Sequence, residues 1–212
     1  MQAQRIHHTA NGLDIGMLEA HERDQALGVI VRGMRDNPLH IAAFGAPLER
    51  RVRREERFFA AAFEAMKMQE HLLAARDDRG RVVGVCGMLP PGQCLPGPAE
   101  GLGMLARLLP AGPGTVARSM RWLGAWSKRD PEERHWHLGP VAVDAHLQGQ
   151  GIGTQMMQVF AARMDATDDA AYLETDKEIN VRFYERFGFR VIGEQPILGV
   201  TNWFMLRPGR GS

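Results

Sequence analysis

Hydrophobic positions recur at helical spacing in two segments of the first third of the chain. Residues 24–35 fit one amphipathic helix, which Asn37 and Pro38 are expected to end. Residues 48–68 fit a second helix, whose apolar positions repeat every three or four residues. The other face of the second helix carries many arginines and glutamates, and we interpret it as a solvated surface with local ion pairs.

A segment rich in proline and glycine follows a predicted hairpin in the middle of the chain. Short β-like runs over residues 71–76 and 81–89 flank a four-residue turn, which is typical of two antiparallel strands. Residues 90–114 predict a long connection, broken by one short helix near residues 102–109. A further helix is predicted over residues 115–127. Connections of this length often border a substrate site.

The last third of the chain alternates between strand and helix patterns. The first helix of this part carries a stripe of methionines, which we interpret as core. The pattern predicts one α+β domain over residues 1–212, built on a mixed sheet with helices on both faces and carrying an insertion at about residues 90–130. The predicted order is a strand over 135–143, a glycine-rich loop over 144–153, a helix over 152–164, a strand over 171–175, a helix over 179–187, and strands over 189–193 and 200–206.

Composition and charge narrow the class of protein. The 212 residues are 44% hydrophobic, which is enough chain to bury about 70% of the unfolded surface around one core. A formal net charge of +1 gives no overall field for collecting nucleic acid or an anionic membrane, so neither is expected as a partner. No apolar run approaches the roughly 20 residues that span a bilayer, and the first residues lack the apolar stretch of a signal peptide. We therefore expect a cytoplasmic protein.

The glycine-rich loop is the strongest functional signal in the sequence. Its glycines let the backbone approach a ligand closely while free N–H groups at a helix start face it, which favours a diphosphate site, although glycines also serve in tight turns. A dinucleotide-binding loop needs a third glycine where Thr154 stands, and a P-loop needs a lysine after the glycines. The loop consists of Gln148, Gly149, Gln150, Gly151, Ile152, Gly153 and Thr154.

The loop resembles the Q/R-x-x-G-x-G/A motif of the GNAT superfamily of acyl-CoA-dependent N-acyltransferases, at Gln148, Gly151 and Gly153. The resemblance covers residues 136–189, where WHLGPVAV, QGQGIGTQMM, YLET and NVRFYERFGF appear in the family's order. From Trp136 onward the chain looks most like puromycin N-acetyltransferase and its relatives, whereas the first 130 residues match only in coarse layout. The resemblance implies a mostly antiparallel sheet that splays in the middle.

The resemblance also implies how acetyl-CoA, the acyl donor, is bound, with no metal involved. The backbone of Val141, Ala142 and Val143 is expected to bond to the pantetheine arm in the gap of the splayed sheet. Residues 148–154 are expected to hold the diphosphate through their main-chain amides. Because these are backbone contacts, the side chains of the strand can be plain aliphatics.

One helix carries two further residues of the resemblance. Tyr184 matches the tyrosine that the family places beside the thioester sulfur, where it protonates the departing thiolate. Asn180 lies one helical turn earlier and resembles the asparagine that binds the pantetheine arm. Many relatives carry that asparagine seven residues before the tyrosine, where this chain has Lys177.

The general base is left open between two residues. An alkylamine with a pKa of about 10.4 is mostly charged at neutral pH, so a base must help it react. His137 lies where some relatives carry a catalytic glutamate, and Glu174 ends the neighbouring predicted strand. His135 shares a strand face with His137, but no third carboxylate or thiol follows at a recognisable spacing, so we expect no metal. The two cysteines, Cys86 and Cys94, form no CxxC pair and are interpreted as reduced thiols.

The sequence thus favours an N-acetyltransferase that transfers the acetyl group of acetyl-CoA to a primary amine of a small molecule, by direct attack in a ternary complex. Acetylation of a protein N-terminus or lysine is an alternative that a wide open groove would favour. A non-catalytic acyl-CoA-binding module is another alternative, and a dinucleotide-binding enzyme is the last. The chain is expected to be a monomer or a homodimer.

Overall fold

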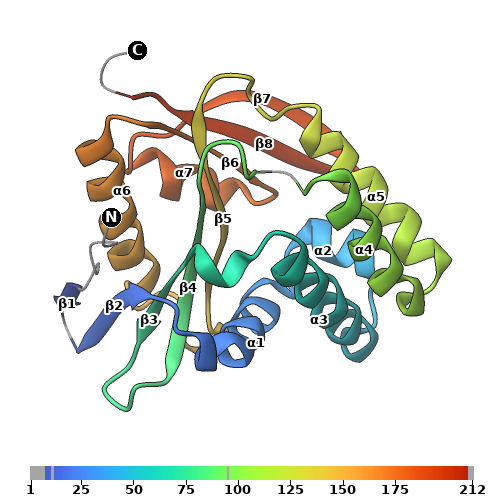
Figure 1. Cartoon of the computed structure of the whole chain (residues 1–212), viewed down its shortest axis with the longest axis horizontal. Helices are drawn as coiled ribbons and strands as arrows, with labels where there is room; N and C mark the ends of the chain where they lie inside the picture. Colours follow the sequence, from blue (N-terminus) through green and yellow to red (C-terminus); the bar gives the residue numbers. More distant parts are fainter. Residues whose placement is uncertain (1–7, 11, 95, 210–212) are drawn as a thin grey trace.

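The computed structural model describes residues 8–10, 12–94 and 96–209 (Figure 1). Within these residues eight strands form one sheet in the order β1-β2-β3-β4-β5-β6-β8-β7. Every pairing is antiparallel except that of β5 with β6, so the sheet is mixed and mostly antiparallel as expected. The strands are β1 (His8–Ala10), β2 (Leu13–Met17), β3 (Leu72–Arg76), β4 (Val82–Leu89), β5 (His135–Val143), β6 (Ala170–Thr175), β7 (Arg190–Ile197) and β8 (Val200–Arg207).

Helices cover both faces of the sheet, because its central strands are apolar on both sides. In β3, Leu72 and Ala74 pack into the core beneath α1 to α5, whereas Leu73 and Ala75 pack into the core beneath α6 and α7. The helices are α1 (Arg23–Met34), α2 (Pro38–Phe44), α3 (Leu48–Ala65), α4 (Pro98–Leu108), α5 (Pro113–Ser127), α6 (Ile152–Thr167) and α7 (Glu178–Glu185). Short 3₁₀ turns lie at Ala20–Glu22, Met68–Glu70, Leu109–Ala111 and Ala145–Leu147.

The sheet opens between β5 and β6. The two strands pair only over the first part of β5, from His135 opposite Ala170 to His137 opposite Tyr172. Beyond His137, β5 continues to pair with β4 on its other side, as far as Val143. The edge of β5 that faces β6 is therefore unpaired over the rest of the strand, which confirms the expected splay in the middle of the sheet.

Three elements near the N-terminus were not predicted from the sequence. Strands β1 and β2 are short and precede the first amphipathic pattern. Helix α2 begins at Pro38, which was expected only to end the preceding helix. Proline is well suited to the first position of a helix, because the N–H that it lacks would have no partner there. Pro38 therefore both ends α1 and begins α2.

A buried ion pair fixes the N-terminal edge of the sheet. The Arg76 guanidinium on β3 donates to both carboxylate oxygens of Glu22 at 2.6 Å. Burial alone would raise the pKa of Glu22, but the hydrogen bonds from Arg76 and from the Glu19 backbone N–H, together with the nearby positive charges, hold that pKa below its usual value. Arg76 also donates to the Met17 carbonyl at 2.9 Å, so one side chain joins β3, β2 and the turn before α1.

Candidate active site

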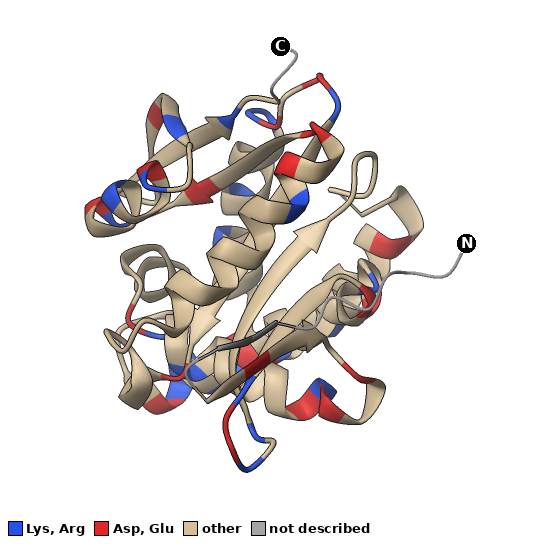
Figure 2. Cartoon of the chain, turned by 90° about the vertical axis from the view of Figure 1, so that its left-hand side faces the viewer, with Lys and Arg blue, Asp and Glu red and all other residues tan. Residues whose placement is uncertain are grey.

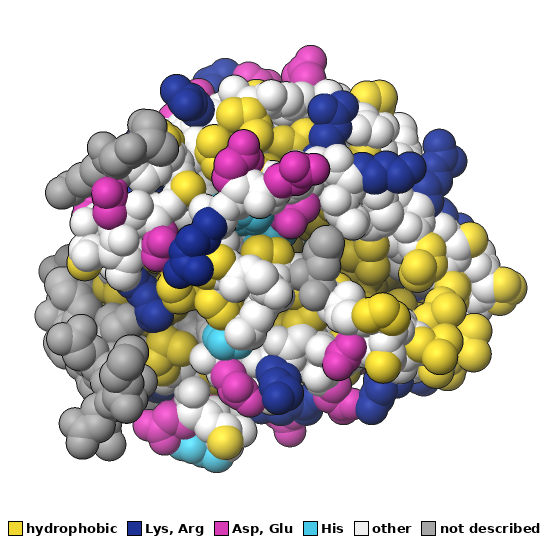
Figure 3. Space-filling model, turned by 45° about the horizontal axis from the view of Figure 1, so that its top comes forward, with side chains coloured by type: hydrophobic (Ala, Val, Ile, Leu, Met, Phe, Trp, Pro, Cys, Tyr) yellow, Lys and Arg dark blue, Asp and Glu magenta, His cyan; other side chains and the backbone are white. Residues whose placement is uncertain are grey.

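A cavity of about 430 Å³ lies where β5 and β6 separate. Residues 138–141 of β5 form one side of it, and Glu174 and Thr175 at the end of β6 form another. Asn180 and Tyr184 reach it from α7. The cavity is thus built on the splay, and the remaining walls come from α1 to α5 and the segment after β4. Figure 3 shows the surface hollowed near its centre, with hydrophobic side chains at the bottom of the hollow.

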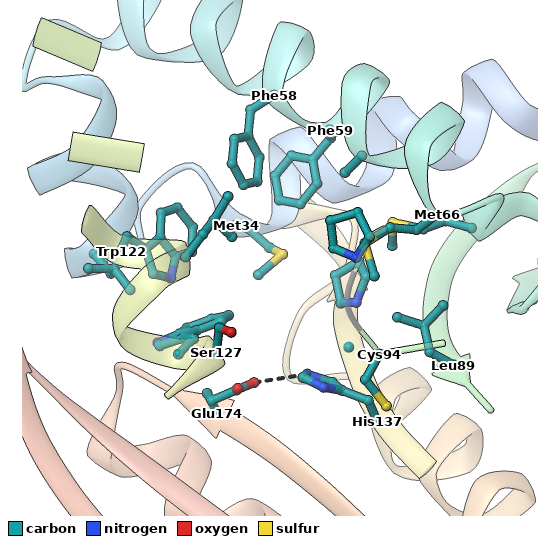
Figure 4. Close-up of a pocket in the computed structure, with 18 of the residues that line it drawn as sticks. Met34, Phe58, Phe59, Met66, Leu89, Cys94, Trp122, Ser127, His137 and Glu174 are labelled. Carbon is teal, nitrogen blue, oxygen red and sulfur yellow. Dashed lines mark ion pairs between the residues drawn. The ribbon is translucent and has the colours of Figure 1, made fainter. Parts of the chain in front are cut away.

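The wall opposite β6 is apolar and aromatic, and we call it the acceptor wall. Phe58 and Phe59 point into the cavity from α3, and Trp122 does so from α5 (Figure 4). The Trp122 ring stacks on Phe58 with 5.4 Å between ring centroids and an interplanar angle of 10°. The acceptor wall consists of Met34, Phe58, Phe59, Met66, Met104, Leu108 and Trp122.

Tyr184 lies on the α7 side of the cavity and is 8% exposed. Burial raises the pKa of its hydroxyl above the usual value, and the nearby Cys86 and Asp176 raise it further. Its ring packs edge-on against Phe183 and Phe189, which fixes the side chain on the sheet. At neutral pH the hydroxyl is therefore a neutral proton donor that faces the cavity.

The two candidate bases lie together at the splay. His137 Nε2 is 2.9 Å from Glu174 Oε2, and the pair faces the acceptor wall across the cavity (Figure 4). The other ring nitrogen, Nδ1, is 3.6 Å from Asp130 Oδ1. Burial alone would lower the pKa of His137, but the charges of Glu174 and Asp130 raise it well above its ordinary value. Both nitrogens of His137 thus face carboxylates.

Asn180 lines the cavity but already has a protein partner. Its amide donates from Nδ2 to Thr175 Oγ1 over 3.1 Å, which ties α7 to the end of β6. Asp176, the next residue after β6, accepts the backbone N–H of Leu39 at 2.7 Å. This second contact joins α2 to the same end of β6.

The glycine-rich loop presents its backbone N–H groups outward. Gly149 and Gly151 have φ angles of +79° and +85°, which residues with a side chain rarely adopt. Gly151 caps the N-terminus of α6. Among the described residues no hydrogen bond has an N–H of residues 149–154 as its donor outside the regular helix pattern. Such a group of free donors at a helix N-terminus fits a diphosphate.

The three strand residues expected at the pantetheine arm differ in their surroundings. Of the three, only Val141 lines the cavity. Ala142 is 4% exposed and lies in the core. The Val143 carbonyl accepts a hydrogen bond from Gln148 Nε2 at 3.1 Å, and that same amide donates to the Gly33 carbonyl. The Gln148 side chain therefore holds the loop against β5 and α1.

Two residues near the candidate bases were not identified from the sequence. Cys94 and Asp130 join His135 and His137, and the four potential ligand atoms lie within 4.8 Å of one another. The sequence shows no third carboxylate or thiol at a recognisable spacing from the two histidines, but the fold brings one of each to them. Cys94 follows β4 and Asp130 follows α5, so neither has a fixed sequence spacing to β5.

The charges of this cluster shift one another. Burial alone would raise the pKa of Cys94, but the two histidines lower it to about 7. Burial alone would lower the pKa of His135, but Asp130 and Cys94 raise it to about 10. The pKa of Asp130 is lowered by the same histidines against the opposing effect of burial. Cys86, which touches no such group, has its pKa raised by burial to about 12.

A family model described as the acetyltransferase (GNAT) family matches residues 38–189. The chain belongs to the GNAT family of acetyltransferases. This membership supports acetyl-CoA binding, and the free donors of the loop and the unpaired edge of β5 fit that ligand. The splayed sheet and the loop before α6 are therefore the two features of this fold that fit acetyl-CoA.

Solved structures share this fold at low identity. A Corynebacterium glutamicum protein described as histone acetyltransferase HPA2 and related acetyltransferase is 20% identical with a TM-score of 0.69, covering 92% of this chain and 95% of its own. Arylalkylamine N-acetyltransferase 2 from Aedes aegypti is 12% identical with a TM-score of 0.63, at 93% and 99% coverage. A Brucella melitensis GNAT family acetyltransferase in complex with acetyl-CoA is 17% identical with a TM-score of 0.52, at 94% and 89% coverage.

The surface and the helices add three observations. Basic and acidic residues are interspersed along the ribbon in the view of Figure 2. In the part of the chain that the structure describes, no helix has the length and apolar character needed to cross a membrane. Figure 3 shows hydrophobic side chains gathered at its right-hand edge. Exposed hydrophobic residues include Leu102 of α4, Leu109 of the 3₁₀ turn that follows it, and Met120 of α5.

Proposed function

We propose that the chain is an acetyl-CoA-dependent N-acetyltransferase whose acceptor is a small primary amine with an apolar, aromatic body. The observation that carries this proposal is a single cavity that joins the unpaired edge of β5 to an aromatic wall. Tyr184 and Glu174 both line that cavity. A thioester in the splay and an amine against the acceptor wall would meet between them.

On the donor side, backbone groups would bind acetyl-CoA. The N–H groups of residues 149–154 would hold the diphosphate at the N-terminus of α6, and the unpaired edge of β5 at Val141 would bond to the pantetheine arm. Asn180, tied to Thr175, would border that arm. The neutral hydroxyl of Tyr184 would then donate a proton to the sulfur as the thioester bond breaks.

On the acceptor side, we propose Glu174 as the base and His137 as the residue that positions it. Both nitrogens of His137 already face carboxylates, so the ring is engaged by Asp130 and Glu174. Glu174 lines the cavity and holds one oxygen against His137. It would take a proton from the amine as the nitrogen bonds to the acetyl carbon, while the electron pair of the C–S bond leaves with sulfur.

The shape of the cavity favours a small acceptor over a protein. Helices α4 and α5 wall it in, whereas a protein substrate needs an open groove. Stacked rings such as Phe58 and Trp122 suit a flat apolar group, which agrees with the arylalkylamine N-acetyltransferase among the similar structures. The resemblance of the segment from Trp136 onward to puromycin N-acetyltransferase also favours a small amine.

The test is thiol release from acetyl-CoA with a panel of acceptors: 2-phenylethylamine, agmatine and a lysine-containing peptide. We expect the highest kcat/KM with 2-phenylethylamine. Glu174→Gln keeps a hydrogen-bond acceptor for His137 and should lower kcat about 100-fold or more at neutral pH. The deficit should narrow as the pH approaches the amine's own pKa of about 10, because the amine then needs no base.

Three results would contradict the proposal. Faster turnover of the peptide than of any small amine would favour protein acetylation. Tight coenzyme A binding without amine-dependent thiol release would favour a binding module. Equal deficits of Glu174→Gln at pH 7 and at pH 10 would remove Glu174 as the base.

A further inference from the structure

Four side chains from three separate segments converge beside the cavity. Cys94 comes from the segment after β4, Asp130 from the segment after α5, and His135 and His137 from β5. We propose that these four residues bind one zinc ion in a closed tetrahedral site. Thiolate, imidazole and carboxylate are the ligand types that zinc takes in proteins.

The distances between the ligand atoms match one tetrahedral ion. Asp130 Oδ1 lies 3.3 Å from His135 Nε2 and 3.6 Å from His137 Nδ1. Cys94 Sγ lies 3.6 Å from His135 Nε2. Bonds of about 2.0–2.1 Å to nitrogen or oxygen and about 2.3 Å to sulfur place the corners of a zinc tetrahedron roughly 3.3–3.6 Å apart. These three pairs have this spacing before any ion is added, and all four atoms lie within 4.8 Å of one another.

The outer nitrogens of both histidines are held in the way that metal ligands require. His135 Nδ1 donates to the Glu133 carbonyl at 2.7 Å, so its Nε2 lone pair faces the cluster. His137 Nε2 lies 2.9 Å from the Glu174 carboxylate, so its Nδ1 lone pair faces the cluster. A carbonyl or carboxylate on the far side of a ligating histidine is a recurring feature of zinc sites, because it fixes the tautomer and the ring orientation.

Two of the atoms that face the centre have no hydrogen-bond partner. Asp130 Oδ1 and His137 Nδ1 are buried, and they lie 3.6 Å apart, which is longer than a normal hydrogen bond. A bound cation would give both atoms a partner at close range.

The position of the ion gives it a structural role. Cys94 lies near the start of the segment that walls the cavity, and Asp130 lies near its end. An ion at the cluster would fasten both ends of that segment to β5. Four protein ligands leave no open coordination position, so the ion takes no part in acetyl transfer, and the inference does not depend on the proposed function.

The test uses the intact chain without a histidine tag. After treatment with a chelator, cobalt(II) is added, and its absorption spectrum reports the ligands. We expect about one cobalt per chain, with the intense visible bands of tetrahedral cobalt and a thiolate charge-transfer band in the near ultraviolet. Zinc should displace the cobalt and so abolish the visible bands and the charge-transfer band. It should also raise the Tm of the wild-type protein by several degrees.

Matched variants assign the thiolate. Cys94→Ser should lose the charge-transfer band and at least 10-fold in cobalt affinity, and zinc should no longer shift its Tm. Cys86→Ala removes the other cysteine, which lies outside the cluster, and should keep the spectrum. Asp130→Asn should weaken binding without removing the band. Absence of tetrahedral bands in the wild type, or an unchanged spectrum in Cys94→Ser, would overturn the proposal.

Discussion

The two sides of the cavity are built in different ways. The donor side consists of one stretch of chain, from β5 through the loop to α7, and it offers main-chain groups at the loop and at β5. The acceptor wall is assembled from α1, α3, α4 and α5 and offers apolar side chains. A binding site made of backbone tolerates many side chains, whereas a wall made of side chains changes with each substitution. We therefore expect variants of the donor side to affect every acceptor equally and variants of the acceptor wall to change acceptor preference.

The largest effect is expected where the two sides meet. Tyr184→Phe removes only the hydroxyl and should lower kcat about 100-fold or more for every amine, with the KM for acetyl-CoA nearly unchanged. Steady-state kinetics with two amines of different size checks this. A deficit that differs between the two amines would place Tyr184 on the acceptor side.

The donor loop can be tested with a pair of glycines. Gly151→Ala and Gly80→Ala both place a side chain at positive φ, at +85° and +73°, and neither added Cβ meets another atom within 4 Å. Each should destabilise the fold by about 1–2 kcal/mol. Only Gly151→Ala should raise the KM for acetyl-CoA, roughly 10-fold and with every amine, because Gly80 lies in the turn between β3 and β4. Equal KM values in the two variants would separate the loop from acetyl-CoA binding.

The acceptor wall can be tested with two phenylalanines one turn apart on α3. Phe59 lines the cavity, whereas Phe63 is fully buried and does not. Replacing either with leucine should cost roughly 1–3 kcal/mol of stability. Phe59→Leu should also raise the KM for 2-phenylethylamine about 2- to 10-fold relative to agmatine, since it loses an aromatic contact. A shift of the same size in Phe63→Leu would mean that preference follows stability and not the wall.

The smallest effect on catalysis is expected at the Glu22–Arg76 pair, which lies outside both sides. The pKa of Glu22 is lower in the folded protein than in the unfolded chain, so its ionised carboxylate stabilises the fold. This stabilisation is fully present above the pKa that Glu22 has in the unfolded chain, and it is lost as the pH falls through the pKa that Glu22 has in the folded protein. Chemical unfolding from pH 7 to pH 3 should show this fall in the wild type and a weaker fall in Glu22→Gln. An equal fall of unfolding free energy with pH in the two proteins would contradict this role of Glu22. The KM values of Glu22→Gln should equal those of the wild type.

The same contrast explains how much the sequence could predict. The splayed strand, the loop and Tyr184 lie in one continuous segment of the chain, so a family resemblance over that segment could predict them. The acceptor wall and the residues Cys94 and Asp130 reach β5 through tertiary packing, and no local pattern marks their meeting. Helix α2 was not predicted because Pro38 was interpreted only as a signal that ends the preceding helix, although it is also the first residue of α2. Strands β1 and β2 are too short to show an alternation of hydrophobic and polar residues.

The most direct measurement is a crystal structure with a bisubstrate analogue, in which coenzyme A is joined through an acetyl group to 2-phenylethylamine. The account predicts the diphosphate at the N–H groups of residues 149–154, the sulfur within hydrogen-bond distance of the Tyr184 hydroxyl, and the phenyl ring against Phe59 and Trp122. A diphosphate bound away from the N-terminus of α6, or a phenyl ring outside the cavity, would contradict it.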